Sequence, residues 1–216
     1  MAEQTVTRPA GEIVAEQVSA EEYLERYAAD HYEWVRGALV KMSPISGKHD
    51  DLTGYLFMWL AAYLALNPIG RVRRAPFVMR LDAIESIREP DLQVILNDNP
   101  GQLTDTAMIG PADLCIEVVS PESVARDYGK KLEEYEKGGV GEYWIIDPAR
   151  QMATFYRMQE TKLYASVQPD TDGYYRAPRL PKLALHVPTL WQDELPGFFA
   201  IGEMVRGMLV EETERK

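Results

Sequence analysis

Cysteine and histidine are scarce in this sequence, which has one cysteine, Cys115, and three histidines among 216 residues. A single cysteine excludes an internal disulfide and fits a reducing compartment. Cys115 lies in an apolar run, so we expect a buried, inert thiol rather than a nucleophile. The sequence also lacks a Cys/His cluster, so a metal site here would have to use oxygen ligands.

Long uninterrupted apolar runs are absent as well, and we therefore expect no membrane span. Residues 1–17 lack the apolar core of a signal peptide, so we expect a cytoplasmic protein. The formal net charge of -11 argues against a large, sequence-independent nucleic-acid surface, because phosphate binding needs clustered cations. A local basic groove is still compatible with that balance. Positive charge gathers in one place, at Arg71, Arg73, Arg74, Arg80 and Arg88.

The composition is that of an ordinary globular chain, with 46% hydrophobic and 26% charged residues. Its length allows one substantial core, and no Ser/Gly linker divides it. Residues 1–18 are polar and without periodicity. We therefore expect a mobile N-terminal arm over residues 1–18 and a single domain over residues 19–216.

The pattern of apolar residues predicts an α/β fold with a mixed sheet flanked by helices. Helices are expected at residues 19–29, 50–66, 121–137 and 195–211. A hairpin is expected at residues 32–42, with Gly37 at or near its turn, and strands at 70–81, 91–96, 114–119 and 142–147. After residue 147 we expect an antiparallel β extension with strands at 153–158, 163–167 and 174–175. Residues 43–47 and 97–111 are expected to be loops.

Two carboxylates stand in strands that are otherwise apolar. Asp91 begins one predicted strand and Glu117 lies inside another, where a bare charge is costly to bury. If the two strands are neighbours, the carboxylates can meet at one edge of the sheet and share a cation, for which oxygen ligands favour Mg²⁺ or Mn²⁺. The alternative is that Asp91 caps a turn and Glu117 pairs with an arginine.

The predicted helix after Pro121 carries Asp127, Lys131 and Tyr135 at a spacing that places them on one face. Asp127 and Lys131 also have the spacing of a plain surface ion pair. The turn at Ser120 and Pro121 folds this helix back near Glu117, where a lysine could stabilise charge on a phosphate oxygen. Lys130 is the alternative lysine for that role.

Several stretches taken together resemble the Uma-two family of restriction-endonuclease-like proteins, within the PD-(D/E)XK nuclease superfamily. The stretches are Glu89–Asp91, Ile116–Pro121 and Gly139–Asp147, with Arg126, Asp127, Lys131 and Tyr135 between the last two. Upstream, Tyr32, Glu33, Gly37, residues 42–44 and His49 match the same pattern. The resemblance covers residues 20–191, and its most specific part is 113–147.

The resemblance implies a restriction-endonuclease-like sheet flanked by helices, with Asp91 and Glu117 as catalytic metal ligands for Mg²⁺ or Mn²⁺. The superfamily signature expects a lysine at position 119, where this chain has Val119. The family pattern places a lysine on the following helix instead, which here is Lys131. His49, Glu33, Asp127 and Tyr135 are then auxiliary residues of the same site.

The function that the resemblance implies is metal-dependent endonucleolytic hydrolysis of phosphodiester bonds, with DNA as the expected substrate. A homodimer is compatible with this function or its alternative, because the apolar segment 198–210 could dock on a second subunit. Arg71, Arg73, Arg74 and Arg80 would contact the nucleic-acid backbone. The alternative is a catalytically inactive nuclease fold that binds nucleic acid or a protein partner. Val119 and the acidic balance favour the alternative, whereas Asp91, Glu117 and Lys131 favour the nuclease.

Overall fold

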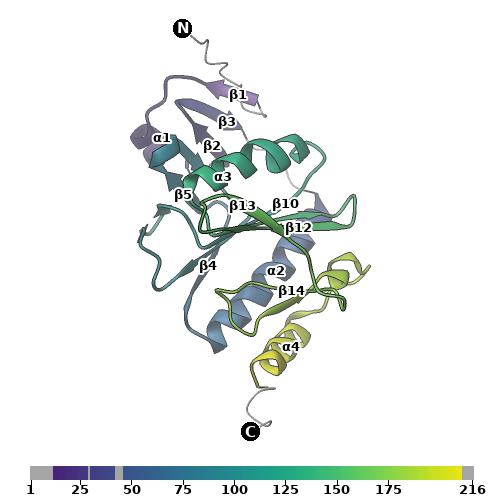
Figure 1. Ribbon diagram of the computed structural model, residues 1–216. Coiled ribbons are helices and arrows are strands. Elements are labelled where there is room, and N and C mark those ends of the chain that lie inside the picture. Colours follow the sequence, from purple (N-terminus) through teal and green to yellow (C-terminus); the bar gives the residue numbers. More distant parts are fainter. Residues whose placement is uncertain (1–11, 29, 42–45, 211–216) are drawn as a thin grey trace.

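The computed structural model describes residues 12–28, 30–41 and 46–210. Figure 1 shows them arranged in layers: a sheet built largely from the N-terminal part, then α3, then a second sheet, then α2 and α4. Helix α3 (Leu132–Gly138) therefore lies between two sheets, while α2 (Gly47–Leu66) covers the outer face of the second one and α4 (Phe198–Val210) packs against α2. In the described residues, no helix combines the length and the apolar character needed to cross a membrane.

The second sheet, here called the central sheet, has six strands in the order β13-β12-β11-β10-β7-β4. Strand β10 is parallel to β11, and the other neighbours are antiparallel. The mixed sheet flanked by helices that the sequence predicts is thus confirmed, as is its antiparallel extension through β12 and β13. The strands are β4 (Gly70–Arg74), β7 (Leu92–Leu96), β10 (Leu114–Val118), β11 (Glu142–Asp147), β12 (Met152–Met158) and β13 (Tyr164–Val167).

The other sheet, here called the N-terminal sheet, has seven strands in the order β1-β3-β2-β6-β5-β9-β8. Its β2–β3 hairpin is confirmed; Arg36 and Gly37, both with positive φ, form the two-residue turn. The strands are β1 (Glu12–Ala15), β2 (Tyr32–Val35), β3 (Ala38–Lys41), β5 (Val78–Leu81), β6 (Ser86–Arg88), β8 (Gln102–Leu103) and β9 (Ala107–Ile109).

The mobile arm expected over residues 1–18 is replaced, in its described part, by ordered structure. Glu12–Ala15 forms β1, which pairs with β3, and Val18 is buried. Residues 1–11 lie outside the described residues, as do residues 42–45 of the expected loop and the end of the expected C-terminal helix.

The expected strand at 70–81 is wrong, because the chain leaves the central sheet after Arg74 and enters the N-terminal sheet at Val78. The expected loop at 97–111 likewise contains β8 and β9. Between β5 and β6 lies a short 3-10 helix, η1 (Asp82–Ile84). Each of these short strands pairs with residues distant in sequence, which local patterns do not reveal.

Helix boundaries shift in ways that matter for the site. Helix α2 begins at Gly47, where Ser46 accepts a hydrogen bond from the His49 amide, so His49 lies in its first turn. The predicted helix at 121–137 begins with a π-helical segment, η2 (Arg126–Lys131), and continues as α3. The other elements are α1 (Ala20–Arg26), β14 (Tyr174–Arg176), β15 (Ala184–His186) and the 3-10 helix η3 (Val187–Trp191).

The two faces of the central sheet bury different side chains. Along β10, Leu114, Ile116 and Val118 belong to the large apolar cluster formed with α2. Cys115 belongs to the cluster on the α3 side, where it is buried as a free thiol. Because side chains alternate along a strand, Glu117 points to the α3 side as well.

Candidate active site

Asp91 and Glu117 lie side by side at one end of the central sheet. The antiparallel register opposes Ile116 with Leu92, which makes Glu117 and Asp91 the next opposed pair. The backbone N–H of Val118 donates to Asp91 Oδ2 over 2.7 Å. The Glu117 side chain is almost fully buried, while that of Asp91 is 18% exposed and reaches the solvent side of the pair. Glu117 of β10 and Asp91, the residue just before the neighbouring strand β7, therefore lie at the same end of the sheet and face the same region.

Glu117 receives two hydrogen bonds from the helix that follows it. Lys131 Nζ and Tyr135 Oη both donate to Glu117 Oε1, each over 2.8 Å. Lys131 is the last residue of the π-helical segment, and its side chain is fully buried. π-helical turns are rare and are often found at functional sites. Lys130, the alternative lysine, instead lies 4.0 Å from Glu134.

Lys131 is also held from the opposite side, by the N-terminal sheet. Glu33 of β2 is completely buried, and its Oε1 lies 3.2 Å from Lys131 Nζ. The backbone N–H of Glu89 donates to the same oxygen over 3.4 Å. Lys131 of η2 thus lies between one carboxylate from each sheet, and these two carboxylates compensate the charge of its buried ammonium group.

Arg88 and Glu134 complete this arrangement, and sequence reasoning did not find them as a pair. Arg88 is buried and donates to Glu33 Oε2 over 2.6 Å and to Glu134 Oε2 over 2.7 Å. Ser86 Oγ donates to Glu134 Oε2 over 3.1 Å. The sequence offered only a weak signal for this pair: Arg88 follows the apolar residue Ile87, and Glu134 lies next to Tyr135 in the predicted helix.

His49 and Asp127 lie at the margins of the same region. His49 Nε2 lies 3.1 Å from Asp91 Oδ2, and Thr53 Oγ1 lies 3.4 Å from its Nδ1. Asp127 is buried, with Oδ1 3.6 Å from Arg126 Nε and 4.0 Å from Lys131 Nζ. All seven residues predicted for the site are therefore brought together, with Glu33 and Tyr135 in direct contact with the Lys131–Glu117 pair.

Carboxylates outnumber cations in this set of residues, here called the buried ionic cluster. Its carboxylates are Glu33, Asp91, Glu117, Asp127 and Glu134, and its cations are Arg88, Arg126 and Lys131. Burial raises the pKa of Glu117 to about 8, although Lys131 acts in the opposite direction. Burial also raises the pKa of Asp127. With every group ionised the cluster would hold more carboxylates than cations, and the raised carboxyl pKa values mean that bound protons offset this imbalance, a role that a bound cation would take over.

Glu33 shows the opposite behaviour. Burial alone would raise its pKa, but Lys131 and Arg88 outweigh that effect and hold the pKa below its ordinary value. Burial opposes the charge on Lys131 as well, yet Glu117 and Glu33 together raise the pKa of Lys131 above its ordinary value. This lysine and this glutamate are therefore held as a charged pair.

A divalent cation fits the donor set that Asp91 and Glu117 offer. Hydrogen bonds within the described residues engage Asp91 Oδ2 and Glu117 Oε1, while Asp91 Oδ1 and Glu117 Oε2 have no such partner there. No group of three or more His, Cys, Asp or Glu side chains in the described residues is arranged to hold a metal ion. Mg²⁺ commonly binds through one or two carboxylates and keeps several waters, so two carboxylates suffice for it.

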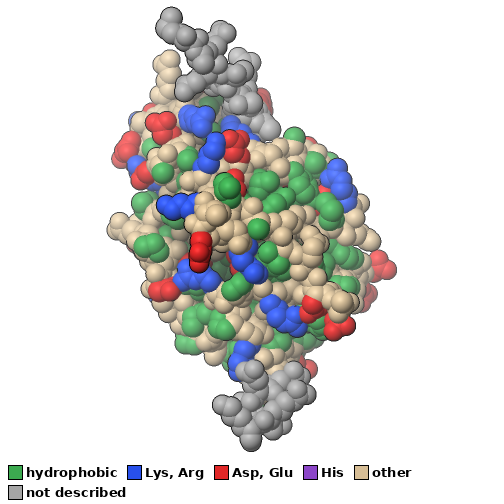
Figure 2. Space-filling model, viewed as in Figure 1, with side chains coloured by type: hydrophobic (Ala, Val, Ile, Leu, Met, Phe, Trp, Pro, Cys, Tyr) green, Lys and Arg blue, Asp and Glu red, His purple; other side chains and the backbone are tan. Residues whose placement is uncertain are grey.

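The four arginines predicted to bind nucleic acid are divided by the structure. Arg71, Arg73 and Arg74 lie on β4, the edge strand of the central sheet. Arg80 lies on β5 of the other sheet, where it pairs with Asp82 over 2.5 Å and with Glu21 over 3.6 Å. On the described part of the face shown in Figure 2, basic and acidic side chains are interspersed, without a continuous basic surface.

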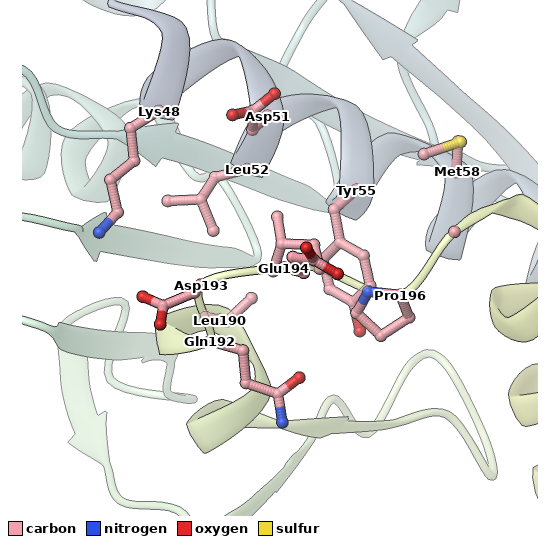
Figure 3. A pocket seen from close by; sticks show the side chains of 12 residues that line it. Lys48, Asp51, Leu52, Tyr55, Met58, Leu190, Gln192, Asp193, Glu194 and Pro196 are labelled. Atoms are coloured by element: carbon pink, nitrogen blue, oxygen red, sulfur yellow. The ribbon is translucent and has the colours of Figure 1, made fainter.

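A cavity of about 500 Å³ opens beside the first turns of α2. Figure 3 shows Lys48, Asp51 and Tyr55 of α2 facing the segment that links η3 to α4, from which Asp193 and Glu194 project. Its charged lining is mainly acidic. Lys48 precedes His49, so the cavity adjoins the candidate site along α2 without sharing its residues.

Comparison with a solved structure supports the fold. The crystal structure described as "a putative nuclease belonging to DUF820 from Anabaena variabilis ATCC 29413" superposes with a TM-score of 0.66. It is 19% identical in sequence, and the match covers 79% of this chain and 96% of that one. At this level of identity the match establishes a shared fold. No match was found among curated proteins.

The sequence comparison extends over most of the domain. The profile of the Uma2 family, described as "Putative restriction endonuclease", matches residues 20–188. That span includes the contributions of both sheets to the buried ionic cluster, whose members run from Glu33 to Glu134. It also agrees with the resemblance seen in the sequence motifs. The chain therefore belongs to the Uma2 family of restriction-endonuclease-like proteins.

Proposed function

We propose that this protein is a metal-dependent endonuclease that hydrolyses phosphodiester bonds in DNA. The observation that carries the proposal is the pair of opposed carboxylates, Asp91 and Glu117, with Lys131 Nζ 2.8 Å from Glu117 Oε1. Membership of a restriction-endonuclease-like family supports a nuclease reaction. The buried, unpaired Cys115 fits a cytoplasmic setting.

In this proposal Asp91 and Glu117 hold Mg²⁺ or Mn²⁺ through carboxylate oxygens. A bound divalent ion would activate a water and stabilise charge on the phosphate. His49 orients Asp91 by its 3.1 Å contact, and Tyr135 orients Glu117 by its 2.8 Å hydrogen bond. Lys131, fully buried between Glu117 and Glu33, keeps Glu117 in place and places a positive charge behind it.

The test is cleavage of supercoiled, linear duplex and single-stranded DNA with Mg²⁺ or Mn²⁺. The wild type is expected to cleave, and Asp91→Asn and Glu117→Gln are expected to lose activity to background because each removes a metal-binding oxygen. Asp193→Asn is the matched control, since it removes an exposed carboxylate from the acidic cavity. Thermal unfolding checks that every variant is folded. Absence of cleavage by wild type, or full activity in both site variants, would refute the proposal.

A second candidate is an inactive nuclease fold that binds nucleic acid or a protein partner. Two observations favour it: position 119 holds a buried valine, and the Lys131 ammonium is enclosed by protein carboxylates. Calorimetric titration with Mn²⁺ separates the two candidates. The endonuclease requires binding that Glu117→Gln weakens, whereas the inactive fold predicts no specific heat in either protein.

We further propose a homodimer formed through α4. Phe198 and Phe199 at its start are 68% and 85% exposed, and Val210 at its end is 48% exposed. Exposed large apolar side chains grouped on one element are typical of an interaction surface. Sedimentation velocity is expected to give a dimer for wild type and a monomer for the Phe198→Ser, Phe199→Ser double variant; a monomeric wild type would exclude the dimer.

A further inference from the structure

Most arginines of the described residues have carboxylate partners, but the three on the edge strand β4 have none there, as is also true of Arg36 and Arg206. Within the described residues, Arg71, Arg73 and Arg74 form no ion pair. Eight other arginines do, namely Arg26, Arg80, Arg88, Arg126, Arg150, Arg157, Arg176 and Arg179. The chain has 34 acidic residues against 23 basic ones, so carboxylates are plentiful. Within the described residues, no carboxylate therefore neutralises the positive charge of β4, which a phosphate group could do.

Two of these arginines line a cavity of about 490 Å³, here called the β4 pocket. Its walls are apolar and aromatic, and no lining residue is acidic; they include Leu24, Phe57, Val72 and Phe77. The Arg73 guanidinium lies 5.5 Å from the centre of the Phe77 ring, and that of Arg74 lies 5.3 Å from the centre of the Phe57 ring. Both rings are partly exposed, so their faces can meet a ligand.

The β4 pocket adjoins the candidate active site through the backbone. Ala75 lines the pocket, and its N–H donates to the carbonyl oxygen of Asp91 over 3.2 Å. Arg74 is opposed to Leu92, the residue after Asp91. A ligand in the pocket would therefore lie next to the strand end that presents the proposed metal-binding carboxylates.

We propose that the β4 pocket binds one unpaired nucleotide of DNA beside the bond to be cleaved, an inference that rests on the proposed nuclease function. The base would lie against Phe57 and Phe77, and the adjoining phosphate would contact Arg73 and Arg74. Cavities of 300–1,000 Å³ are of a size to enclose a small ligand, and aromatic faces beside cations are how proteins hold unpaired bases. A base inside a duplex is stacked and paired, and cannot enter such a pocket.

The acidic cavity beside α2 is a useful comparison, because it differs from the β4 pocket mainly in the charge of its lining residues. It has nearly the same volume, but Asp51, Asp193 and Glu194 line it and only Lys48 offsets them. A phosphate there would meet like charge, whereas in the β4 pocket it would meet arginines alone. Of the two cavities, only the β4 pocket has the charge that an unpaired DNA strand requires.

The experiment measures binding without cleavage, by fluorescence anisotropy in EDTA. The probes are a labelled single strand of about ten thymidines and a blunt duplex of the same length, sized to cover one binding site. We expect the single strand to bind at least about fivefold more tightly, the lower end of what stacking of one base contributes. Equal affinity for both probes would overturn the proposal.

The variants separate stacking from charge. Phe57→Leu removes the ring but keeps an apolar side chain, and should weaken the single strand about fivefold without changing the salt dependence. Arg74→Gln should weaken it and lower the slope of log affinity against log salt by about 0.7. Arg36→Gln is the charge-matched control, because Arg36 in the β2–β3 turn is exposed, lies outside the pocket and also forms no ion pair with described residues. An equal loss in Arg36→Gln, or unchanged binding in both pocket variants, would contradict the inference.

Two further comparisons complete the test. Tighter binding of the corresponding uridine strand would overturn the assignment to DNA. Cleavage by wild type together with normal binding by Phe57→Leu and Arg74→Gln would overturn the pocket and leave the nuclease intact. Pocket-dependent binding in a protein that never cleaves would support the pocket and refute the nuclease.

Discussion

The two faces of the central sheet differ in what they bury: one buries apolar side chains and the other buries charged ones. On β10, Ile116 joins an apolar cluster with Leu56 and Trp59 of α2, whereas its neighbour Glu117 joins the buried ionic cluster against α3. Both side chains are buried. One strand thus serves stability on one face and a candidate chemistry on the other, because successive side chains alternate.

The two faces should also differ in how much stability is lost when one buried side chain is substituted. An apolar side chain that is shortened leaves a cavity, and its neighbours keep their own contacts. A charge that is removed leaves its partners buried and unpaired, which costs more than the missing interaction itself. The ionic face should therefore depend more strongly on each member than the apolar face does.

The largest effect is expected for Lys131→Met. Removal of the ammonium leaves Glu33 and Glu117 buried without their shared cation, and should lower the free energy of unfolding by about 3–5 kcal/mol. Urea denaturation measures it. Lys137→Met is the control: Lys137 and Glu133 form an exposed pair further along the same helix, worth less than about 1 kcal/mol. Equal effects from the two lysines would mean that burial of the pair carries no special cost.

On the apolar face, Leu56→Ala is expected to cost about 2–5 kcal/mol, because the fully buried side chain leaves a cavity. The same denaturation measurement applies, with Leu66→Ala, 54% exposed, as the control and a change within about 0.5 kcal/mol. DNA cleavage per folded molecule should be unchanged. A selective loss of cleavage would show that the two faces are not independent.

The pH dependence of stability sharpens the comparison for Glu33. Its folded-state pKa lies below the ordinary value of 4.5, so it contributes stability above that pH and loses it as the pH falls. Between about pH 5 and pH 3 the wild type should lose stability more steeply than Glu33→Gln, by up to about 1.4 kcal/mol per pH unit. Chemical denaturation at several pH values measures both slopes, and parallel slopes would show that Glu33 is not held as a charged group.

The smallest effect is expected for Tyr135→Phe, which deletes one hydrogen bond to Glu117 Oε1 and leaves Lys131 in place. The cost should be about 1 kcal/mol in unfolding free energy. Phe is nearly the same shape, so packing against Tyr143 is retained. A loss as large as that of Lys131→Met would show that the hydroxyl, rather than the ammonium, holds Glu117.

Much of the apolar framework could be predicted from sequence. The run at β10 reads as a strand buried on both faces, and Glu117 stands out within it because a carboxylate there needs a partner. The spacing of Lys131 and Tyr135 placed both on one face, and both do contact Glu117. These inferences succeed because they depend on neighbours close in sequence or on the period of a strand.

The other parts of the fold and of the candidate site depend on contacts between residues far apart in the sequence, which a local pattern cannot predict. Arg88 reaches Glu33 across 55 positions and Glu134 across 46, and Glu134 looks like any exposed helix glutamate. The π-helical turn at Arg126–Lys131 has no sequence marker that we could use. The break of the expected strand at Ala75 was signalled by Pro76, but its consequence, a change of sheet, follows only from tertiary packing.

The position of α3 between two sheets bears on how the protein can be shortened. A chain that started at α2 would keep every strand of the central sheet, together with Asp91, Glu117 and Lys131. It would nevertheless discard β2 and with it Glu33, so that the ammonium group would lose one of its two enclosing carboxylates and Arg88 one of its anchors. Strand β2 is thus part of the electrostatic framework of the candidate site, and a shortened chain must retain Glu33 to keep that framework intact.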